Sequence, residues 1–85
     1  MKIDVIKGMI KDSTWIDPER HTVYKFANEN HLVIDGSNHI KYKVKRSNNR
    51  IVIQLGSAKK YFVEYVNDFI LNIYNHEEKF MITPA

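Results

Sequence analysis

Short stretches in which apolar and polar residues alternate fill most of the chain between residues 23 and 83, and clusters of Asn, Asp, Gly and Ser separate them. Alternation with a period of two is typical of β-strands that bury one face, and Asn, Asp and Gly accept the positive φ angles of tight hairpin turns. The pattern predicts strands at Val23–Ala27, His31–Asp35, His39–Arg46, Arg50–Leu55, Lys60–Val66, Phe69–Asn75 and Glu78–Thr83.

The turns between these strands set a register, because residues that pair across a hairpin lie on the same face of the sheet. A two-residue turn at Asn67-Asp68 pairs Glu64 with Leu71. A four-residue loop at residues 56–59 pairs Ile53 with Phe62. The other predicted pairs are Val66–Phe69, Phe62–Ile73, Ile73–Phe80, Leu71–Ile82, Val44–Ile53, Tyr42–Leu55, Ile34–Ile40 and Phe26–Leu32. Every pair keeps large apolar residues on one side, whereas a slip of one residue would turn a strand over. The predicted inner face consists of Tyr24, Phe26, Leu32, Ile34, Ile40, Tyr42, Val44, Ile51, Ile53, Leu55, Phe62, Glu64, Val66, Phe69, Leu71, Ile73, Phe80 and Ile82.

Consecutive antiparallel strands around one curved core predict a mainly β fold. We expect a meander of seven to eight strands that forms a small barrel or half-barrel, in a single domain spanning residues 1–85. Before the strands, Ile3, Ile6 and Ile10 have helical spacing and predict a short N-terminal helix that ends near Lys11. Residues 13–16 then form a further strand, from which Trp15 plugs one end of the barrel or anchors the helix to it.

The order of a helix, the dipeptide Thr14-Trp15, the strand around Tyr24-Lys25-Phe26 and the hairpins that follow resembles the small lipocalin-like (calycin) up-and-down barrels. The resemblance covers about residues 10–84. It implies a closed barrel that holds a small apolar or amphipathic molecule in its interior.

Glu64 is the one charged residue that the predicted register places among the apolar inner residues. A carboxylate buried without a partner is unfavourable, and its pKa would rise until it became neutral. Glu64 therefore either reaches water or a hydroxyl at an open rim, or it orients a ligand in a pocket built with Tyr42, Tyr24 and Trp15. A role in proton transfer would need a second titratable group nearby, and the sequence indicates none.

The predicted outer face divides into a basic half and an apolar half. Lys41, Lys43 and Lys45 follow one strand, as lysines do where they prevent strands from pairing edge to edge. The outer face of the last three strands carries a patch that equals or exceeds what monomers usually expose, formed by Tyr61, Val63, Tyr65, Ile70, Tyr74 and Met81. The N-terminal helix, a second copy of the chain or an outside partner could cover this patch.

Signatures of catalysis and of metal binding are absent from the sequence, which contains no Gly-rich phosphate loop, no Gly-x-Ser-x-Gly and no His-Glu-x-x-His. We therefore expect no enzyme activity, no catalytic residue, no metal and no cofactor. Cys is absent, which excludes a disulfide framework, and no apolar run has the length of a signal peptide core or a membrane span. We expect a cytoplasmic protein without a membrane partner.

The first functional hypothesis is a protein-interaction or self-associating module, such as a homodimer, that uses the tyrosine-rich outer face. The alternative is lipocalin-like binding of a small apolar or amphipathic ligand inside the barrel. The second alternative is weak binding of single-stranded nucleic acid, since tyrosines stack on bases and the net charge is +3. Nucleic acid is the least favoured partner, because the lysines and the tyrosines lie on different strands.

Overall fold

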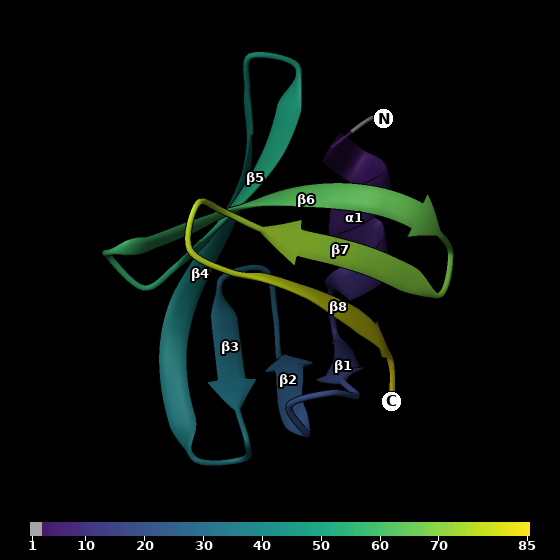
Figure 1. The fold of residues 1–85 in the computed structure, drawn as a ribbon. Helices are drawn as coiled ribbons and strands as arrows, with labels where there is room; N and C mark the ends of the chain where they lie inside the picture. Colours follow the sequence, from purple (N-terminus) through teal and green to yellow (C-terminus); the bar gives the residue numbers. More distant parts are fainter. Residues whose placement is uncertain (1–2) are drawn as a thin grey trace.

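The computed structural model describes residues 3–85, which form a closed antiparallel barrel of eight strands and one short helix (Figure 1). The helix and strands are α1 (Ile3–Ile10), β1 (Ser13–Asp17), β2 (Thr22–Phe26), β3 (His31–Ile34), β4 (Asn38–Ser47), β5 (Arg50–Leu55), β6 (Lys59–Asn67), β7 (Ile70–Tyr74) and β8 (Lys79–Pro84). Each strand pairs with the next one in the chain, and β8 closes the barrel by pairing with β1. The predicted mainly β meander with an N-terminal helix is confirmed.

Half of the ten predicted residue pairs are confirmed. Val44 pairs with Ile53 and Tyr42 with Leu55 across β4 and β5, and Ile73 pairs with Phe80 across β7 and β8. The predicted pairs Leu71–Ile82 and Phe26–Leu32 are present as well. The pair Ile34–Ile40 is wrong, because Ile34 lies opposite Asn38 and Ile40 lies opposite Leu32. This error of two residues leaves both isoleucines on the predicted face.

The prediction for β6 is wrong by one residue, and the strand is turned over. Tyr61 lies opposite Ile53, Val63 opposite Ile73 and Tyr65 opposite Leu71, so Tyr61, Val63 and Tyr65 face the interior. The loop before β6 is one residue shorter than expected, because Lys59 already pairs with Leu55. An irregularity between Tyr65 and Asn67 shifts the β6–β7 pairing by one residue, so that Leu71 and Ile73 of β7 still face the interior as predicted.

Four residues of the predicted inner face consequently lie outside the barrel interior: Phe62, Glu64, Val66 and Phe69. Val66 is 46% exposed, and Phe69 is 69% exposed in the turn between β6 and β7. The predicted pair Val66–Phe69 is not formed, since Ile70 pairs with Asn67 instead.

The α1 helix covers one end of the barrel. It packs against β1 and β4, and Ile6 and Ile10 are buried in the same apolar cluster as Trp15. The Ser13 hydroxyl donates to the carbonyl of Ile10 (2.6 Å) and accepts from the Trp15 indole N–H (2.9 Å), which joins the end of α1 to β1. Trp15 therefore anchors the helix, as one of the two sequence interpretations proposed. The first of the three possible covers for the outer patch, the N-terminal helix, is therefore wrong, because α1 packs against β1 and β4 instead.

The turns divide between the two ends of the barrel, because successive strands run in opposite directions. The β2–β3, β4–β5 and β6–β7 turns lie at the end where α1 packs, and the other turns surround the opposite end (Figure 1). The described part of the chain contains no helix with the length and apolar character of a membrane span.

Candidate functional site

The residues predicted to form a ligand pocket do not come together. Glu64 is exposed on the outer face, where its Oε1 accepts a hydrogen bond from Asn72 Nδ2 (3.0 Å). Trp15 is buried beneath α1, while Tyr42 and Tyr24 line clefts at different ends of the barrel. The position of Glu64 results from the reversed face of β6, which carries its side chain away from the interior.

Side chains fill the interior of the barrel. Among the described residues, the cavity between the inner faces has a volume of about 20 Å³, which is close to the space of one water molecule. The side chains around it are all apolar or aromatic: Tyr24, Phe26, Leu32, Ile53, Leu55, Ile73, Phe80 and Ile82. A ligand of the size that small-molecule pockets usually hold does not fit into this space.

The predicted tyrosine-rich interface is divided between the two faces of the sheet. Tyr61 is 4% exposed, and Val63 and Tyr65 are half-buried and pack against the core. Tyr74 and Ile70 are half-buried on the outer face, where Met81 is exposed as predicted.

Phe62 lies on the outer face of β6, where Tyr61 and Tyr65 were predicted. Its ring lies 5.5 Å from the ring of Tyr74, and the Arg50 guanidinium lies 4.8 Å from its centroid. The outer face therefore carries a smaller, mixed patch instead of a contiguous tyrosine surface.

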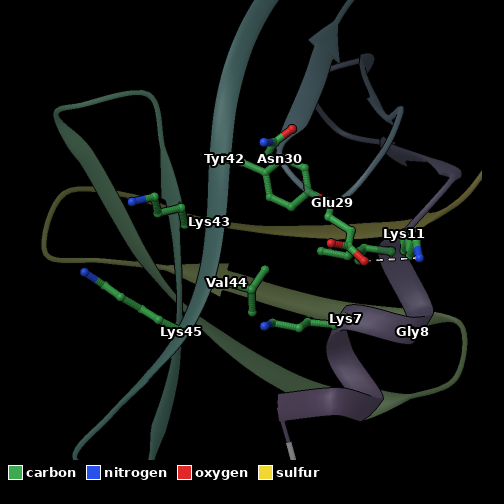
Figure 2. Close-up of a pocket in the computed structure, with 10 residues that line it drawn as sticks. Lys7, Gly8, Lys11, Glu29, Asn30, Tyr42, Lys43, Val44 and Lys45 are labelled. Carbon is green, nitrogen blue, oxygen red and sulfur yellow. Dashed lines mark ion pairs between the residues drawn. The ribbon is translucent and has the colours of Figure 1, made fainter.

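A cleft of about 380 Å³ lies between α1 and β4, at the helix-covered end of the barrel (Figure 2). It is lined by Lys7, Gly8, Ile10, Lys11, Glu29, Asn30, Tyr42, Lys43, Val44 and Lys45. Ile10 and Tyr42 are buried and form its floor with Val44. Its apolar floor and charged rim give this cleft, which we call the α1–β4 cleft, the composition of a binding site.

Positive charge dominates the rim of the α1–β4 cleft. Four lysines and one glutamate line it, and the glutamate, Glu29, forms an exposed ion pair with Lys11 (Nζ–Oε1 3.3 Å). Lys7 reaches from α1 toward Val44, whereas Lys43 and Lys45 extend from β4 on the side away from the helix (Figure 2). The cleft is therefore suited to an anionic ligand with apolar groups.

The floor of the cleft is fixed by a hydrogen bond. The Tyr42 hydroxyl donates to the carbonyl of Asn28 (2.6 Å), and the Phe26 ring contacts the Tyr42 ring edge-on at 5.1 Å. Burial raises the pKa of Tyr42, and the negative charges of Asp12 and Glu29 raise it further. Tyr42 therefore stays protonated at neutral pH and holds the β2–β3 turn against β4.

The opposite, open end of the barrel carries a network of paired charges. Arg20 Nε donates to Asp17 Oδ2 (2.7 Å), and Arg20 Nη1 donates to Glu78 Oε1 (2.9 Å). The Tyr61 hydroxyl donates to Glu78 Oε2 (3.1 Å), and the Arg20 guanidinium lies 4.0 Å from the centroid of Phe80. The residues of this mouth surround a shallow cleft of about 370 Å³.

The pKa values at the mouth follow from this network. Burial alone would raise the pKa of Asp17, but hydrogen bonds from the side chain and backbone of Arg20 and from the Glu19 N–H lower it overall. The hydrogen bond from Arg20 lowers the pKa of Glu78. Burial, followed by the hydrogen bond to Glu78, raises the pKa of Tyr61 to about 12. Both carboxyl groups are therefore ionised and Tyr61 is protonated at neutral pH.

His31 and His39 lie together on the outside of the barrel. His31 Nε2 and His39 Nδ1 are 3.0 Å apart, and Asp35 of the neighbouring turn accepts from the Val23 N–H (2.8 Å). Within residues 3–85, no group of three or more His, Asp or Glu side chains could hold a metal ion.

The sequence interpretation missed the Asp17–Arg20–Glu78 network and the two lysines Lys7 and Lys11, in and directly after α1. A signal was present for the first, because Asp17-Pro18 is a turn dipeptide and Asp side chains accept backbone N–H groups two and three residues on. The pairing of Arg20 with Glu78, 58 residues away, depends on closure of the barrel. The position of Lys7 and Lys11 beside β4 depends on where α1 packs.

Comparison of the chain with protein-family models, with curated proteins and with solved structures finds no match.

Proposed function

We propose that this chain is a non-catalytic protein-interaction module that binds an acidic segment of a partner protein in the α1–β4 cleft. The observation that carries the proposal is the excess of lysines, four against one glutamate, around an apolar floor. Charge complementarity accelerates association and selects the partner, while contact with the floor supplies apolar burial. This keeps the interaction function that the sequence favoured and moves it from the outer tyrosine face to the cleft.

The test is the binding of a fluorescent acidic peptide that also contains apolar residues, measured by polarisation at two salt concentrations. Replacement of Lys43 and Lys45 by Glu reverses the charge beside the cleft and should weaken binding by roughly tenfold or more, as expected for charge pairs at an interface. The matched control replaces Lys25 and Lys79, which are exposed on β2 and β8, by Glu. It changes the net charge equally and should leave the affinity within about twofold.

Equal weakening by the two double variants would contradict the proposal, because it would show attraction to the net charge alone. Tighter binding of a single-stranded oligonucleotide than of any acidic peptide, with a steep salt dependence, would favour the nucleic-acid alternative instead.

The mouth of the barrel supports a second candidate, the binding of a small amphipathic molecule at the open end. The supporting observation is an apolar and aromatic wall beneath a polar rim, in which Tyr24 and Phe80 lie with ring centroids 6.0 Å apart and Arg20 lies above Phe80. Because the interior is filled, such a ligand would lie in the mouth rather than inside the barrel.

This second candidate predicts a local response to a probe. Titration with a medium-chain fatty acid should shift the amide NMR signals of Ser57, Ala58 and Lys59, which border the mouth. Ala58→Trp should obstruct the mouth and remove the shifts, whereas Ser47→Trp at the other end should preserve them. Shifts confined to α1 and β4 would contradict a site at the mouth.

A further inference from the structure

One edge of β4 is paired with β3 over only part of its length. The last β3–β4 pair is His31–Lys41, after which the Tyr42 N–H donates to the carbonyl of Asn30 (3.1 Å). β4 continues to Ser47 and remains paired with β5 over that whole stretch. From Lys43 onward, β4 is therefore paired with a neighbouring strand on its β5 side only, within the described residues.

The direction of the backbone groups along this edge follows from two hydrogen bonds. The Lys41 carbonyl accepts from the Gly56 N–H (2.8 Å) and points to the β5 side, while the Tyr42 N–H points to the β3 side. Successive residues of a strand alternate between the two sides. Val44 therefore directs its N–H and C=O toward the α1–β4 cleft, and no backbone group of residues 3–85 bonds to it there.

The cleft leaves room beside this edge. Gly8 of α1 lines the opposite wall, and a Cβ added to Gly8 would meet no atom within 4 Å. Figure 2 shows α1 and β4 facing each other across the cleft, with the Lys7 side chain between them. The Lys7 side chain is exposed, and the stem of a lysine has several rotatable bonds, so it can move aside without disturbing the core.

The orientation of Lys43 and Lys45 distinguishes a strand from a compact ligand. Both side chains extend along the outer face of β4, away from α1 (Figure 2). A compact anion in the cleft would meet Lys7 and Lys11 but not these two side chains. Side chains at alternate positions of an added strand would lie on the same face as Lys43 and Lys45, at the distance of cross-strand neighbours.

We infer that the acidic partner segment binds as an added strand, which pairs with the β4 edge at Val44 and carries acidic residues at alternate positions beside Lys43 and Lys45. Its intervening residues are apolar and contact the floor formed by Tyr42, Val44 and Ile10. Addition of a strand to an exposed sheet edge is an established mode of peptide recognition. The lysines repel a basic strand, including the β4 strand of another copy, and thereby select an acidic one. The inference rests on the proposed function.

The test uses a capped peptide of alternating Glu and Val, and two versions of it that carry N-methyl groups on alternate backbone nitrogens. In an added strand, one set of alternate N–H groups faces β4 and the other faces away. Methylation of the first set should weaken binding by about tenfold, through lost hydrogen bonds and steric conflict, and methylation of the second set should change it little. A peptide with the same composition but with its Glu residues grouped at one end should also bind more weakly.

Hydrogen exchange supplies a readout on the protein. Binding should slow exchange of the Val44 amide and leave the Lys43 amide unchanged, since Lys43 already faces β5. If both methylated peptides bind like the parent while Lys43→Glu with Lys45→Glu still weakens binding, the added strand is wrong and the acidic-segment function stands. If no acidic peptide binds, both are wrong.

Discussion

At the end of the barrel covered by α1, four lysines and one glutamate line the cleft, whereas at the open end Arg20 is bonded to two carboxylates. The lysines extend into solvent, and Lys11 alone among the cleft lysines has a carboxylate partner in the described part of the chain. The charges of the mouth are instead held by hydrogen bonds, and Asp17 is only 1% exposed.

This difference separates charges that maintain the fold from charges that are available to a partner. Loss of one member of a buried, hydrogen-bonded ion pair strongly destabilises the folded protein, whereas exposed lysines contribute little to folding. Changes at the mouth should therefore lower stability, and changes at the rim of the α1–β4 cleft should lower affinity. Four variants test this comparison, and the first concerns the apolar contacts that hold α1 in place.

Ile6→Ala should have the largest effect on stability. Ile6 is fully buried between α1 and the barrel, so its truncation removes apolar contacts and leaves a cavity, at a cost of about 2–5 kcal/mol. The free energy of unfolding in urea measures the loss. Val5→Ala is the matched control, because Val5 is exposed on the same helix. Equal effects of the two variants would show that α1 does not depend on burial of its inner face.

Asp17→Asn should lower stability by about 1–3 kcal/mol at neutral pH, because it removes the charge that binds Arg20 and keeps the side-chain shape. The pKa values of Asp17 and Glu78 are lowered by folding, so their stabilisation is present above the ordinary carboxyl pKa range. It is lost as the pH falls through the lowered values. Urea unfolding between pH 6 and pH 3 should thus be less pH-dependent in the variant. The exposed neighbour Glu19→Gln should retain the wild-type dependence.

Tyr61→Phe should cost about 0.5–1.5 kcal/mol, since it removes one hydrogen bond to Glu78 and preserves the buried ring. The pKa of Tyr61 is raised to about 12, so the neutral hydroxyl stabilises the fold at lower pH. This contribution disappears as the pH rises from the ordinary tyrosine value through the raised one. In an ultraviolet titration of the tyrosines, the ionisation step at the highest pH should be missing from the variant. Retention of that group would assign the high pKa to another tyrosine.

The alternation of residues sufficed to predict the barrel and the inner faces of six strands, but not the face of β6. The reason lies in the composition of that strand, where Tyr61, Val63 and Tyr65 alternate with Phe62 and Val66. Both faces are apolar enough to be buried, so the pattern did not distinguish them. The length of the loop between β5 and β6 decided which face is buried, and a loop of three residues or of four residues fits the sequence equally well.

The α1–β4 cleft could be predicted only in part. The alternation placed Lys43 and Lys45 correctly on the outer face of β4, and the spacing of Ile6 and Ile10 predicted the helix that packs beside it. The cleft itself arises because β3 is shorter than β4 and because α1 covers an end of the barrel. Both are tertiary properties, which strand periodicity does not contain.

Replacement of Lys43 and Lys45 by Gln should have the smallest effect on stability and the clearest effect on binding. Gln retains most of the apolar part of the lysine side chain, so contacts of residue 45 with the buried Val52 opposite it are largely kept. The replacement also removes two like charges from one strand. The free energy of unfolding should change by no more than about 0.5 kcal/mol, while affinity for an acidic peptide falls several-fold. A loss of stability comparable to that of Asp17→Asn would make these lysines part of the fold and would remove the distinction between the two ends. Preserved stability with weaker binding would show that these two lysines serve the binding of a partner and not the folding of the chain.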